Sequence, residues 1–179
     1  MPPTPITIRS AAPSDALCLS VLGMHVFLDT YVTEGIRPST ARKVTSSFSE
    51  PVIAQAIASP SSVVLVAERL ERLIALAHVN LDTSHAMAPA GTQAELLRLY
   101  VQTPFLRSGV GSSLLASAER AATERGASVL WLTPWVHNAG ALAFYNRRGY
   151  QDLGPIESPS FEGTSHPNRF LAKLLRGAA

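Results

Sequence analysis

The sequence has 179 residues, of which 46% are hydrophobic and 16% are charged. This length fits one domain of ordinary size, and the apolar fraction is enough for a core, so a disordered chain is excluded. Fifteen basic and thirteen acidic residues give a net charge of +2 without a block of like charges. That pattern excludes a nucleic-acid-binding footprint and weakly favours an anionic small-molecule ligand. We expect a single domain over residues 1–179.

The sequence also lacks the marks of export or membrane insertion. Its first ten residues do not form a basic segment followed by an apolar one, and the apolar runs at 63–67 and 73–77 are too short to cross a bilayer. We therefore expect a cytoplasmic protein without a membrane partner. The single cysteine, Cys18, excludes an internal disulfide and a cysteine-based zinc site. It lies in the apolar run 17–19, which predicts a buried, unreactive thiol.

The first half of the chain predicts a strand, then helices, then strands. Apolar and polar residues alternate around Ile6 and Ile8, and Pro13 introduces a helical pattern. A charged turn at 69–72 separates two β-rich runs and indicates an antiparallel hairpin, which is followed by a loop at 82–92. The predicted elements are a strand at 6–9, a helix from 13 through 22, two short helices within 38–58, and strands at 62–68, 73–81 and 95–101.

The second half predicts alternating helices and strands. The turn at 109–111 opens a helix that ends at Gly126, which stands where glycine commonly closes a helix. The run 129–132 is apolar without alternation, as is typical of a strand buried on both faces in a parallel pair. A helix at 139–148 stops at Gly149, a strand begins at Tyr150, and a closing strand lies near 170–175. The order of elements predicts a mixed α/β fold around one sheet.

A glycine-rich turn, Leu106-Arg107-Ser108-Gly109-Val110-Gly111-Ser112, lies between a strand and a helix. The N–H groups at a helix start and the positive end of its dipole bind phosphate oxygens, and glycines let the backbone approach closely. Arg107 and Ser112 could add side-chain contacts. A plain tight turn, with Ser112 as a helix cap, is the alternative. The turn lacks the lysine of a P-loop and the third glycine of a dinucleotide-binding motif.

These residues resemble the GNAT superfamily of acyl-CoA-dependent N-acetyltransferases. The family's cofactor motif, Gln/Arg-x-x-Gly-x-Gly/Ala, is matched by residues 106–111, although Leu106 stands where Gln or Arg is usual. A second motif, Asn-x-x-Ala-x-x-Phe-Tyr-x-x-x-Gly-Phe/Tyr, is matched at the positions Asn138, Ala141, Phe144, Tyr145, Gly149 and Tyr150.

The resemblance implies a single-domain GNAT fold, with a mostly antiparallel central sheet, a parallel pair splayed at the cofactor site and flanking helices. It also implies acetyl-CoA as co-substrate and no metal. The implied cofactor-binding residues are Leu99, Val101, Leu106, Arg107, Ser108, Gly109, Val110, Gly111, Ser112 and Asn138. Leu99 and Val101 would pair through their backbone with the pantetheine arm, and Asn138 would either contact that arm or cap a helix.

Two residues match family positions that carry chemistry. Glu95 matches a position that some members use as the general base, and strand alternation puts it on the face of Leu97 and Leu99. Its alternative role is a solvated carboxylate at a strand end. Tyr145 matches the hydroxyl that protonates the leaving thiolate, and its alternative role is a core aromatic.

The resemblance implies direct acetyl transfer to a primary amine of a small molecule or a peptide. Two alternatives stay open: an N-terminal protein acetyltransferase, and a non-catalytic acyl-CoA-binding sensor. The segment 27–31 and the closing strand also look like the bacterial polyamine acetyltransferase branch. The acids that could hold a polycation are scattered along the chain and form no visible cluster: Asp29, Glu34, Glu68, Glu71, Asp82 and Glu95. Homodimers are frequent in the family.

Overall fold

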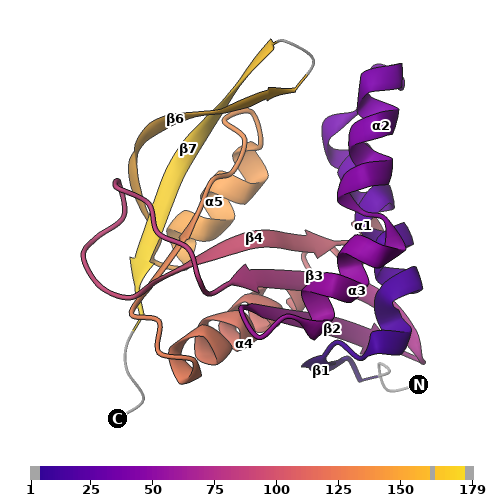
Figure 1. Ribbon diagram of the computed structural model, residues 1–179, viewed down its shortest axis with the longest axis horizontal. Coiled ribbons are helices and arrows are strands. Elements are labelled where there is room, and N and C mark those ends of the chain that lie inside the picture. Colours follow the sequence, from indigo (N-terminus) through magenta and orange to yellow (C-terminus); the bar gives the residue numbers. More distant parts are fainter. Residues whose placement is uncertain (1–4, 162–163, 176–179) are drawn as a thin grey trace. The chain divides into compact units, whose positions relative to one another are not determined.

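The computed structural model describes residues 5–161 and 164–175 and has the predicted mixed α/β architecture (Figure 1). Its strands form a seven-stranded sheet in the order β1-β2-β3-β4-β5-β7-β6. The elements in chain order are β1 (Thr7–Ser10), the 3₁₀ turn η1 (Pro13–Asp15), α1 (Ala16–Tyr31), α2 (Pro38–Ser47), α3 (Glu50–Ala58), β2 (Ser62–Arg69), β3 (Arg72–Asn80), β4 (Gln93–Val101), η2 (Thr103–Phe105), α4 (Val110–Glu124), β5 (Val129–Leu132), α5 (Ala139–Arg147), β6 (Gln151–Phe161) and β7 (Thr164–Leu174).

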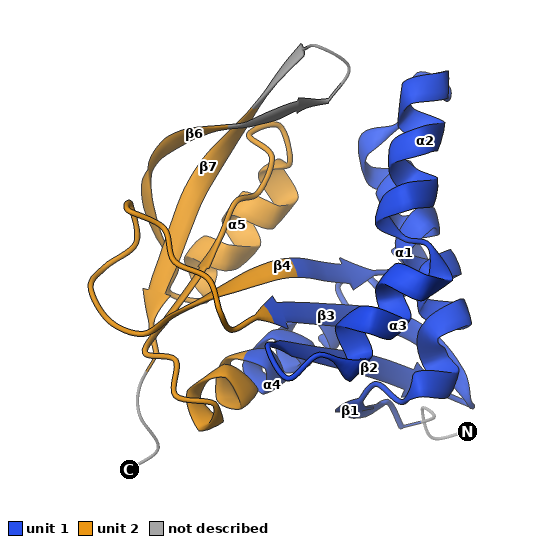
Figure 2. Ribbon diagram, viewed as in Figure 1, with its two compact units in different colours: residues 1–79, 98–118 blue, residues 80–97, 119–179 orange. Residues whose placement is uncertain are grey.

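Internal contacts divide the chain into two compact units (Figure 2). Unit 1 contains residues 1–79 and 98–118, and unit 2 contains residues 80–97 and 119–179. The boundary falls within β4 and within α4, so both of these elements contribute to each unit. Below, each unit is described by itself.

The core of unit 1 is formed where α1, α2 and α3 pack on β2 and β3. Its buried members are Ala16, Leu19, Leu22, Val26, Val44, Phe48, Ile53, Val66 and Leu76. An ion-pair network tethers β1 next to this core. Arg9 donates from Nη1 to Asp15 Oδ2 at 2.7 Å and from Nη2 to Glu68 Oε2 at 2.7 Å. The hydrogen bond from Arg9 is the main reason why the pKa of Asp15 lies below its usual value.

Cys18 lies on the outer side of α1, so the prediction of a buried thiol was wrong. Leu17 and Val21, its neighbours on that side, are exposed as well. The buried face of α1 is formed by Leu19, Leu22 and others, which follow the helical repeat of 3.6 residues. An apolar run of three residues in a helix spans nearly a full turn, and some of its members must therefore face away from the core.

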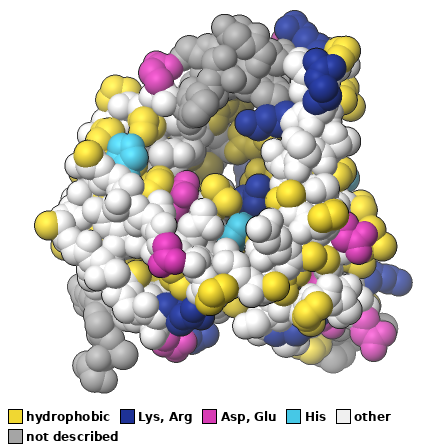
Figure 3. All heavy atoms as spheres, in the orientation of Figure 1, with side chains coloured by type: hydrophobic (Ala, Val, Ile, Leu, Met, Phe, Trp, Pro, Cys, Tyr) yellow, Lys and Arg dark blue, Asp and Glu magenta, His cyan; other side chains and the backbone are white. Residues whose placement is uncertain are grey.

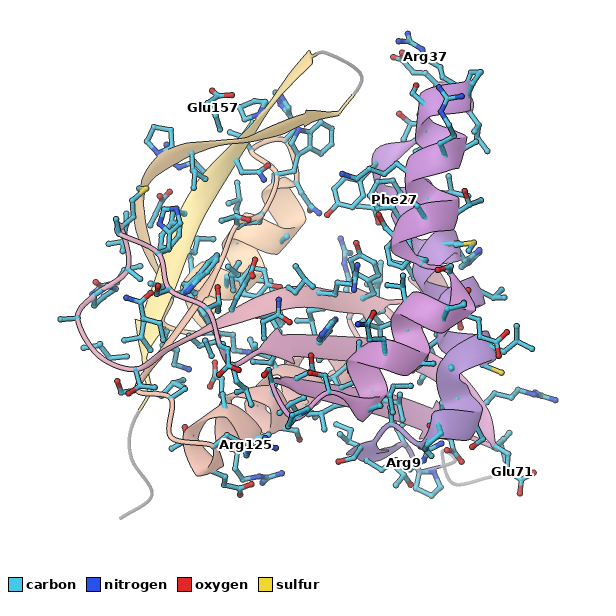
Figure 4. The ribbon with its side chains drawn as sticks, in the orientation of Figure 1. Arg9, Phe27, Arg37, Glu71, Arg125 and Glu157 are labelled. Atoms are coloured by element: carbon cyan, nitrogen blue, oxygen red, sulfur yellow. The ribbon has the colours of Figure 1, made fainter. Side chains whose placement is uncertain are left out.

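The predicted hairpin in unit 1 is confirmed, because β2 and β3 are neighbours in the sheet and are joined by the two residues Leu70 and Glu71. Both residues have positive φ, at 51° and 57°, as a type I′ turn requires. Figure 4 shows Glu71 projecting outward from this turn. The turn therefore closes the hairpin with two residues that carry side chains in the left-handed region.

Unit 2 contains the predicted parallel pair. β4 pairs with β5 in parallel from Gln93↔Val129 to Glu95↔Trp131, and β5 is buried along its whole length. β7 then pairs antiparallel with both β5 and β6. At the end of α4, the N–H of Ala127 donates to Ala122 O at 3.0 Å, and Gly126 has φ of 92°, which together form a Schellman motif. The glycine that the sequence pattern placed at the helix end is confirmed.

The closing strand is longer than predicted, because β7 begins at Thr164 and forms an extended hairpin with β6. Prolines in this segment conceal the strands in the sequence, since proline removes a ladder hydrogen bond and is typical of loops. Pro155 is accommodated because β6 lies at the edge of the sheet. A register shift between Asp152 and Gly154 marks an irregularity just before it.

On the face shown in Figure 3, basic side chains gather over α2, while elsewhere basic and acidic side chains are mixed. The exposed basic residues in and beside α2 are Arg37, Arg42 and Lys43. Among the described residues, no helix is both long enough and apolar enough to cross a membrane.

Candidate active site

The predicted cofactor turn lies in unit 1, between the end of β4 and the start of α4. Its first half is closed by local hydrogen bonds, in which Leu106 N donates to Thr103 O at 3.2 Å and Ser108 Oγ donates to Phe105 O at 2.6 Å. Arg107 and Gly109 both have positive φ, at 61° and 89°. These two left-handed residues bend the chain on either side of Ser108 and direct it into the helix.

The start of α4 presents backbone donors to solvent-accessible space. The first bond at this end runs from Ser113 N to Gly109 O at 3.0 Å, so the N–H groups of Val110, Gly111 and Ser112 precede the intrahelical ladder. Val110 is buried and anchors the helix start, whereas residues 106–109 are exposed. A Cβ built on Gly109 meets nothing within 4 Å. The turn therefore places backbone N–H groups at the positive end of a helix dipole, next to exposed residues, which suits phosphate oxygens.

The strand segment that leads into this turn is held in place from one face. Leu99 and Val101 are half-buried, and Tyr100 between them contacts the ring of Phe48 at 6.0 Å between centroids. Gln102 N donates to Ile74 O at 3.0 Å, which fixes the end of β4 against β3. Burial raises the pKa of Tyr100 above its ordinary value, so this phenol stays neutral as a packing residue.

Arg98 and His78 form a polar contact within the apolar interior of unit 1. Arg98 Nη1 donates to His78 Nδ1 at 3.1 Å, and His78 Nε2 lies 3.1 Å from Ser62 Oγ. Since a guanidinium only donates, His78 accepts at Nδ1 and carries its proton at Nε2. Burial and the nearby Arg98 charge lower the pKa of His78 to about 4. His78 is therefore a neutral, buried histidine in the core of unit 1.

Glu95 lies on β4 in unit 2, as the Cα partner of Trp131 in the parallel pair. It is half-buried between the buried residues Ala94 and Leu96, which face the other side of the strand. Leu97, two residues on, is 40% exposed, so the predicted apolar setting of Glu95 is partly open to solvent. A carboxylate in this position is accessible and sits beside an indole.

Asn138 caps α5, which is the alternative that the sequence left open. Its Oδ1 accepts from Ala141 N at 3.0 Å, and its own N–H donates to Trp135 O at 3.0 Å. This side-chain oxygen satisfies one of the N–H groups at the helix start. The amide nitrogen of the Asn138 side chain is not engaged by that cap, so capping and a ligand contact are compatible.

Tyr145 is buried near the end of α5, with 8% of its surface exposed. Its ring makes edge-on contacts with Phe144 and Tyr150, at 5.2 Å and 5.5 Å between centroids. The N–H of Tyr150 donates to Tyr145 O at 3.2 Å, so the turn after the helix folds back on this residue. The backbone and ring of Tyr145 are therefore rigidly held, which suits a phenol that must be positioned.

The hydroxyl of a second tyrosine, next to Tyr145, contacts a partly buried ion pair. Tyr150 OH donates to Glu119 Oε1 at 3.0 Å, and Lys173 Nζ donates to both oxygens of Glu119 at 2.9 and 2.8 Å. Burial, and then the Glu119 charge, raises the pKa of Tyr150 well above its ordinary value. This network could not be predicted from the sequence, because its members are far apart in the chain and each is ordinary by itself.

An aromatic cluster around Trp131 was also missed. His85, Trp131 and Phe170 contact one another in unit 2, with centroid distances of 4.6 to 5.6 Å. The one signal available in the sequence was a tryptophan within a fully apolar strand, because its indole N–H needs a partner there. Within the described part of the chain, no group of three or more His, Cys, Asp or Glu side chains is placed to hold a metal ion.

The structure thus gathers the predicted cofactor residues 99–112 in unit 1, and Glu95, Asn138 and Tyr145 in unit 2. Residues 31–150 match the sequence model of the acetyltransferase (GNAT) family. An N-acetyltransferase from Lactobacillus delbrueckii subsp. lactis, described as uncharacterized, is 25% identical over 146 residues, covering 82% of this chain and 84% of the relative. An IAA acetyltransferase from Azospirillum brasilense is 33% identical over 103 residues, covering 57% of this chain and 63% of the relative.

Solved structures of acetyltransferases share the fold. The PaiA N-acetyltransferase from Thermoplasma acidophilum, solved in complex with coenzyme A, has a TM-score of 0.74 and 19% identity, covering 95% of this chain and 99% of that one. The acetyltransferase YncA from Salmonella typhimurium, solved with acetyl-CoA, has a TM-score of 0.70 and 19% identity, covering 98% of this chain and 97% of that one. At these identities the likeness concerns the fold alone.

Proposed function

The chain belongs to the acetyltransferase (GNAT) family, and from this premise we propose that it transfers an acetyl group directly from acetyl-CoA to a primary amine of a small molecule or a peptide. One observation supports this proposal more than any other. In the accessible turn at residues 106–112, backbone N–H groups at the start of α4 are placed to donate to a ligand. This segment lies within the residues that match the family and contains the sequence that resembles its cofactor motif.

Acetyl-CoA is the co-substrate of the family, and the turn suits its phosphates. The open space at Gly109 leaves room for an anion. Arg107, two residues earlier, has a left-handed backbone conformation that helps to form the turn. Backbone N–H groups provide the main contacts with phosphate, so Leu106 in place of Gln or Arg leaves the turn functional. The backbone of Leu99 and Val101, on the strand that leads into the turn, pairs with the pantetheine arm in this proposal.

The proposed reaction needs one base and one acid. An alkylammonium has a pKa of about 10, so Glu95 takes a proton from it, directly or through water. The amine nitrogen then attacks the thioester carbonyl, a C–N bond forms, and the C–S bond breaks. The nitrogen loses its second proton to solvent as the amide forms, and Glu95 releases the first proton to solvent. Tyr145 donates its phenol proton to the departing CoA thiolate and regains a proton from solvent. The fixed ring of Tyr145 supports this role, since an acid must be positioned before it can assist.

The nature of the acceptor is a separate question, and relatives differ in what they are named for. Polyamines are one candidate acceptor, because residues 27–31 look like the polyamine acetyltransferase branch. The acceptor of the related IAA acetyltransferase is another. An N-terminal protein acetyltransferase remains the second candidate within the same fold. We further propose that residues 1–179 form one catalytic domain, that it acts in the cytoplasm, and that it forms a homodimer.

The proposal is tested by a screen of polyamines, amino acids, amino-acid amides, aminoglycosides and peptides with acetyl-CoA, in which free CoA is measured. Release of CoA that depends on one class of amine supports an acetyltransferase. Thermal melting with desulfo-CoA is the companion measurement, because a ligand that binds only the native state raises the melting temperature. A raised melting temperature with no CoA release from any amine would instead indicate an acyl-CoA sensor. No shift at saturating CoA would contradict the proposed cofactor turn.

A further inference from the structure

The indole N–H of Trp131 is buried and has no hydrogen-bond partner among the described residues. Trp131 is only 6% exposed, and it lies on β5 in a strand that is buried throughout. A buried donor without a partner loses its hydration and gains nothing in return, so such groups are rare in native proteins and call for an explanation. The position of Trp131 in the sheet provides one.

Trp131 shares a face of the sheet with the proposed base. Glu95 and Trp131 are Cα partners in neighbouring parallel strands, so their side chains project to the same side, about 4.8 Å apart at the backbone. Trp131 is likewise the partner of Ala172 on β7, and Phe170, two residues away, projects to that side as well. One face of unit 2 therefore carries a carboxylate beside two large aromatic side chains.

The aromatic side chains stack rather than merely touch. The rings of Trp131 and Phe170 are nearly parallel, with 5.2 Å between centroids and 21° between planes. His85 covers both rings, at 5.6 Å from Trp131 and 4.6 Å from Phe170. We refer to His85, Trp131 and Phe170 as the indole pocket. Two of its three rings are apolar, and its buried polar group, Trp131 Nε1, is a hydrogen-bond donor.

The cover of the indole pocket is a loop and not a helix or strand. His85 belongs to the segment 81–92, in which Ala88 N donates to His85 O at 3.0 Å and Met87 N donates to His85 Nδ1 at 3.1 Å. Gln93 ties this turn to β4, because its Oε1 accepts from His85 N at 2.7 Å and its Nε2 donates to Pro89 O at 3.4 Å. The turn is closed on itself and is held by Gln93 and by the packing of Met87 and Ala88 against the core cluster that contains Trp131 and Phe170, so it lifts as a unit when these contacts break.

We propose that the indole pocket binds the acceptor. The acceptor is a primary alkylamine that also carries an aromatic ring and a carbonyl or carboxylate oxygen. This inference rests on the proposed acetyl transfer and names the substrate class for it. The aromatic body of the acceptor lies against Trp131 and Phe170 once the turn at His85 lifts. Its oxygen accepts from Trp131 Nε1, and its amine lies toward Glu95, which neighbours Trp131 in the sheet.

The donor character of the pocket discriminates between amine classes. A polyamine at neutral pH carries ammonium groups, which donate hydrogen bonds and do not accept them. It would leave the Trp131 N–H without a partner. An amino-acid amide or a peptide amine has a carbonyl next to the amine and satisfies the donor. The pocket therefore favours these acceptors over polyamines.

Kinetics with two matched amines test the substrate class. L-phenylalaninamide and 2-phenylethylamine share the aromatic ring and a primary amine, and only the first has a carbonyl oxygen. Because this carbonyl also lowers the pKa of the amine, the rates are compared per neutral amine. We expect kcat/KM for L-phenylalaninamide to be higher by about tenfold or more, as for a site that holds a hydrogen-bond donor for the substrate. Trp131→Phe keeps the ring and removes the N–H, so it should abolish this preference by raising KM for L-phenylalaninamide while leaving kcat nearly unchanged. An equal preference in wild type and Trp131→Phe would overturn the proposal.

Fluorescence gives a readout that does not depend on turnover. The sequence has two tryptophans, so Trp135→Phe leaves Trp131 as the reporter and also serves as the matched control for Trp131→Phe. Titration of this variant with L-phenylalaninamide should change its emission to saturation, whereas spermidine should not. In the same background, Gln93→Ala unties the turn and should increase quenching of Trp131 by acrylamide. Unchanged quenching would overturn the assignment of residues 81–92 as the cover.

The outcomes separate this inference from the proposed function. Acetylation of spermidine with neither binding nor acetylation of L-phenylalaninamide would overturn the pocket and leave acetyl transfer standing. Saturable fluorescence with L-phenylalaninamide, together with no response to CoA in thermal melting, would support the pocket and contradict acetyl transfer. Thermal melting of each variant without ligand confirms that Trp131→Phe and Gln93→Ala remain folded.

Discussion

Arg98 donates from Nη1 to His78 Nδ1 at 3.1 Å, so an interior histidine is held in its neutral form by a permanent cation. Burial opposes protonation of the ring most strongly, and the guanidinium of Arg98 beside it opposes protonation further, so the pKa of His78 is lowered to about 4. In the unfolded chain His78 is exposed to water, and its pKa is about 6.5. The stability of unit 1 is therefore linked to pH.

The sign of this linkage follows from the two pKa values. Between about pH 6.5 and pH 4 the unfolded state binds a proton that the folded state does not, so stability falls as the pH falls through this window. We expect a loss of about 2 kcal/mol from pH 7 to pH 5. Urea unfolding of wild type and His78→Gln at both pH values measures it, and the variant should lose distinctly less. Equal losses would show that other groups cause the acid sensitivity.

The cofactor turn can be tested with two glycines in the same backbone state. Gly109 and Gly126 have φ of 89° and 92°, and a Cβ on either meets nothing within 4 Å. Valine at each position should therefore cost a similar backbone strain, about 1 to 3 kcal/mol. We expect Gly109→Val to weaken CoA binding by about tenfold or more, because its side chain occupies the space proposed for phosphate, and Gly126→Val to leave affinity nearly unchanged. Calorimetric titration of CoA into both folded variants decides between them.

Replacement of the proposed base should change the dependence of the rate on pH. Glu95→Gln keeps the shape of the side chain and removes the proton acceptor, so kcat/KM should fall about 10²-fold near neutral pH. The deficit should shrink toward pH 9, where more of the acceptor amine is neutral. Glu124→Gln, at the exposed end of α4, is the control and should match wild type. Wild-type rates for Glu95→Gln from pH 6 to 9 would return this residue to the role of a structural carboxylate.

The two neighbouring tyrosines should separate chemistry from stability. Tyr145→Phe removes the proposed acid, and we expect kcat to fall by about 10- to 10³-fold with CoA affinity nearly constant. Tyr150→Phe removes the hydrogen bond to Glu119, and the expected loss is about 1 to 2 kcal/mol of stability with kcat largely kept. Steady-state rates and urea unfolding of both variants measure these effects. The assignments fail if Tyr145→Phe turns over at the parental rate.

Most of the fold could be predicted from the sequence, because the spacing of hydrophobic residues indicates which segments form helices and which form strands. The apolar run of β5 predicted a buried parallel strand, and the glycines at 126 and 149 predicted where helices end. Cys18 shows the limit of this approach, since an apolar neighbour in the sequence does not give the direction of a side chain on a helix. Both strands of the β6–β7 hairpin were predicted, but its length was not, because its prolines are typical of loops.

For the candidate site, the sequence predicted only the local structure that short motifs describe. The turn at 106–112 and the Asn138 position are short-range patterns, and both lie where such patterns predict them, at the starts of α4 and α5. The pairing of Tyr150 with Glu119, and of Trp131 with Phe170, depends on which strands become neighbours. No property of the individual residues encodes that adjacency, so these contacts required the sheet order.

The hairpin turn at Leu70 and Glu71 has a practical consequence for enzyme engineering. Two residues with side chains occupy left-handed positions that asparagine and glycine adopt with less strain, so Leu70→Asn with Glu71→Gly should raise the melting temperature. A gain of about 1 kcal/mol would correspond to roughly 2–4 °C for a chain of this size. The exchange replaces an exposed leucine as well, which should improve solubility. Such a background would let costly substitutions elsewhere in the molecule be purified and assayed.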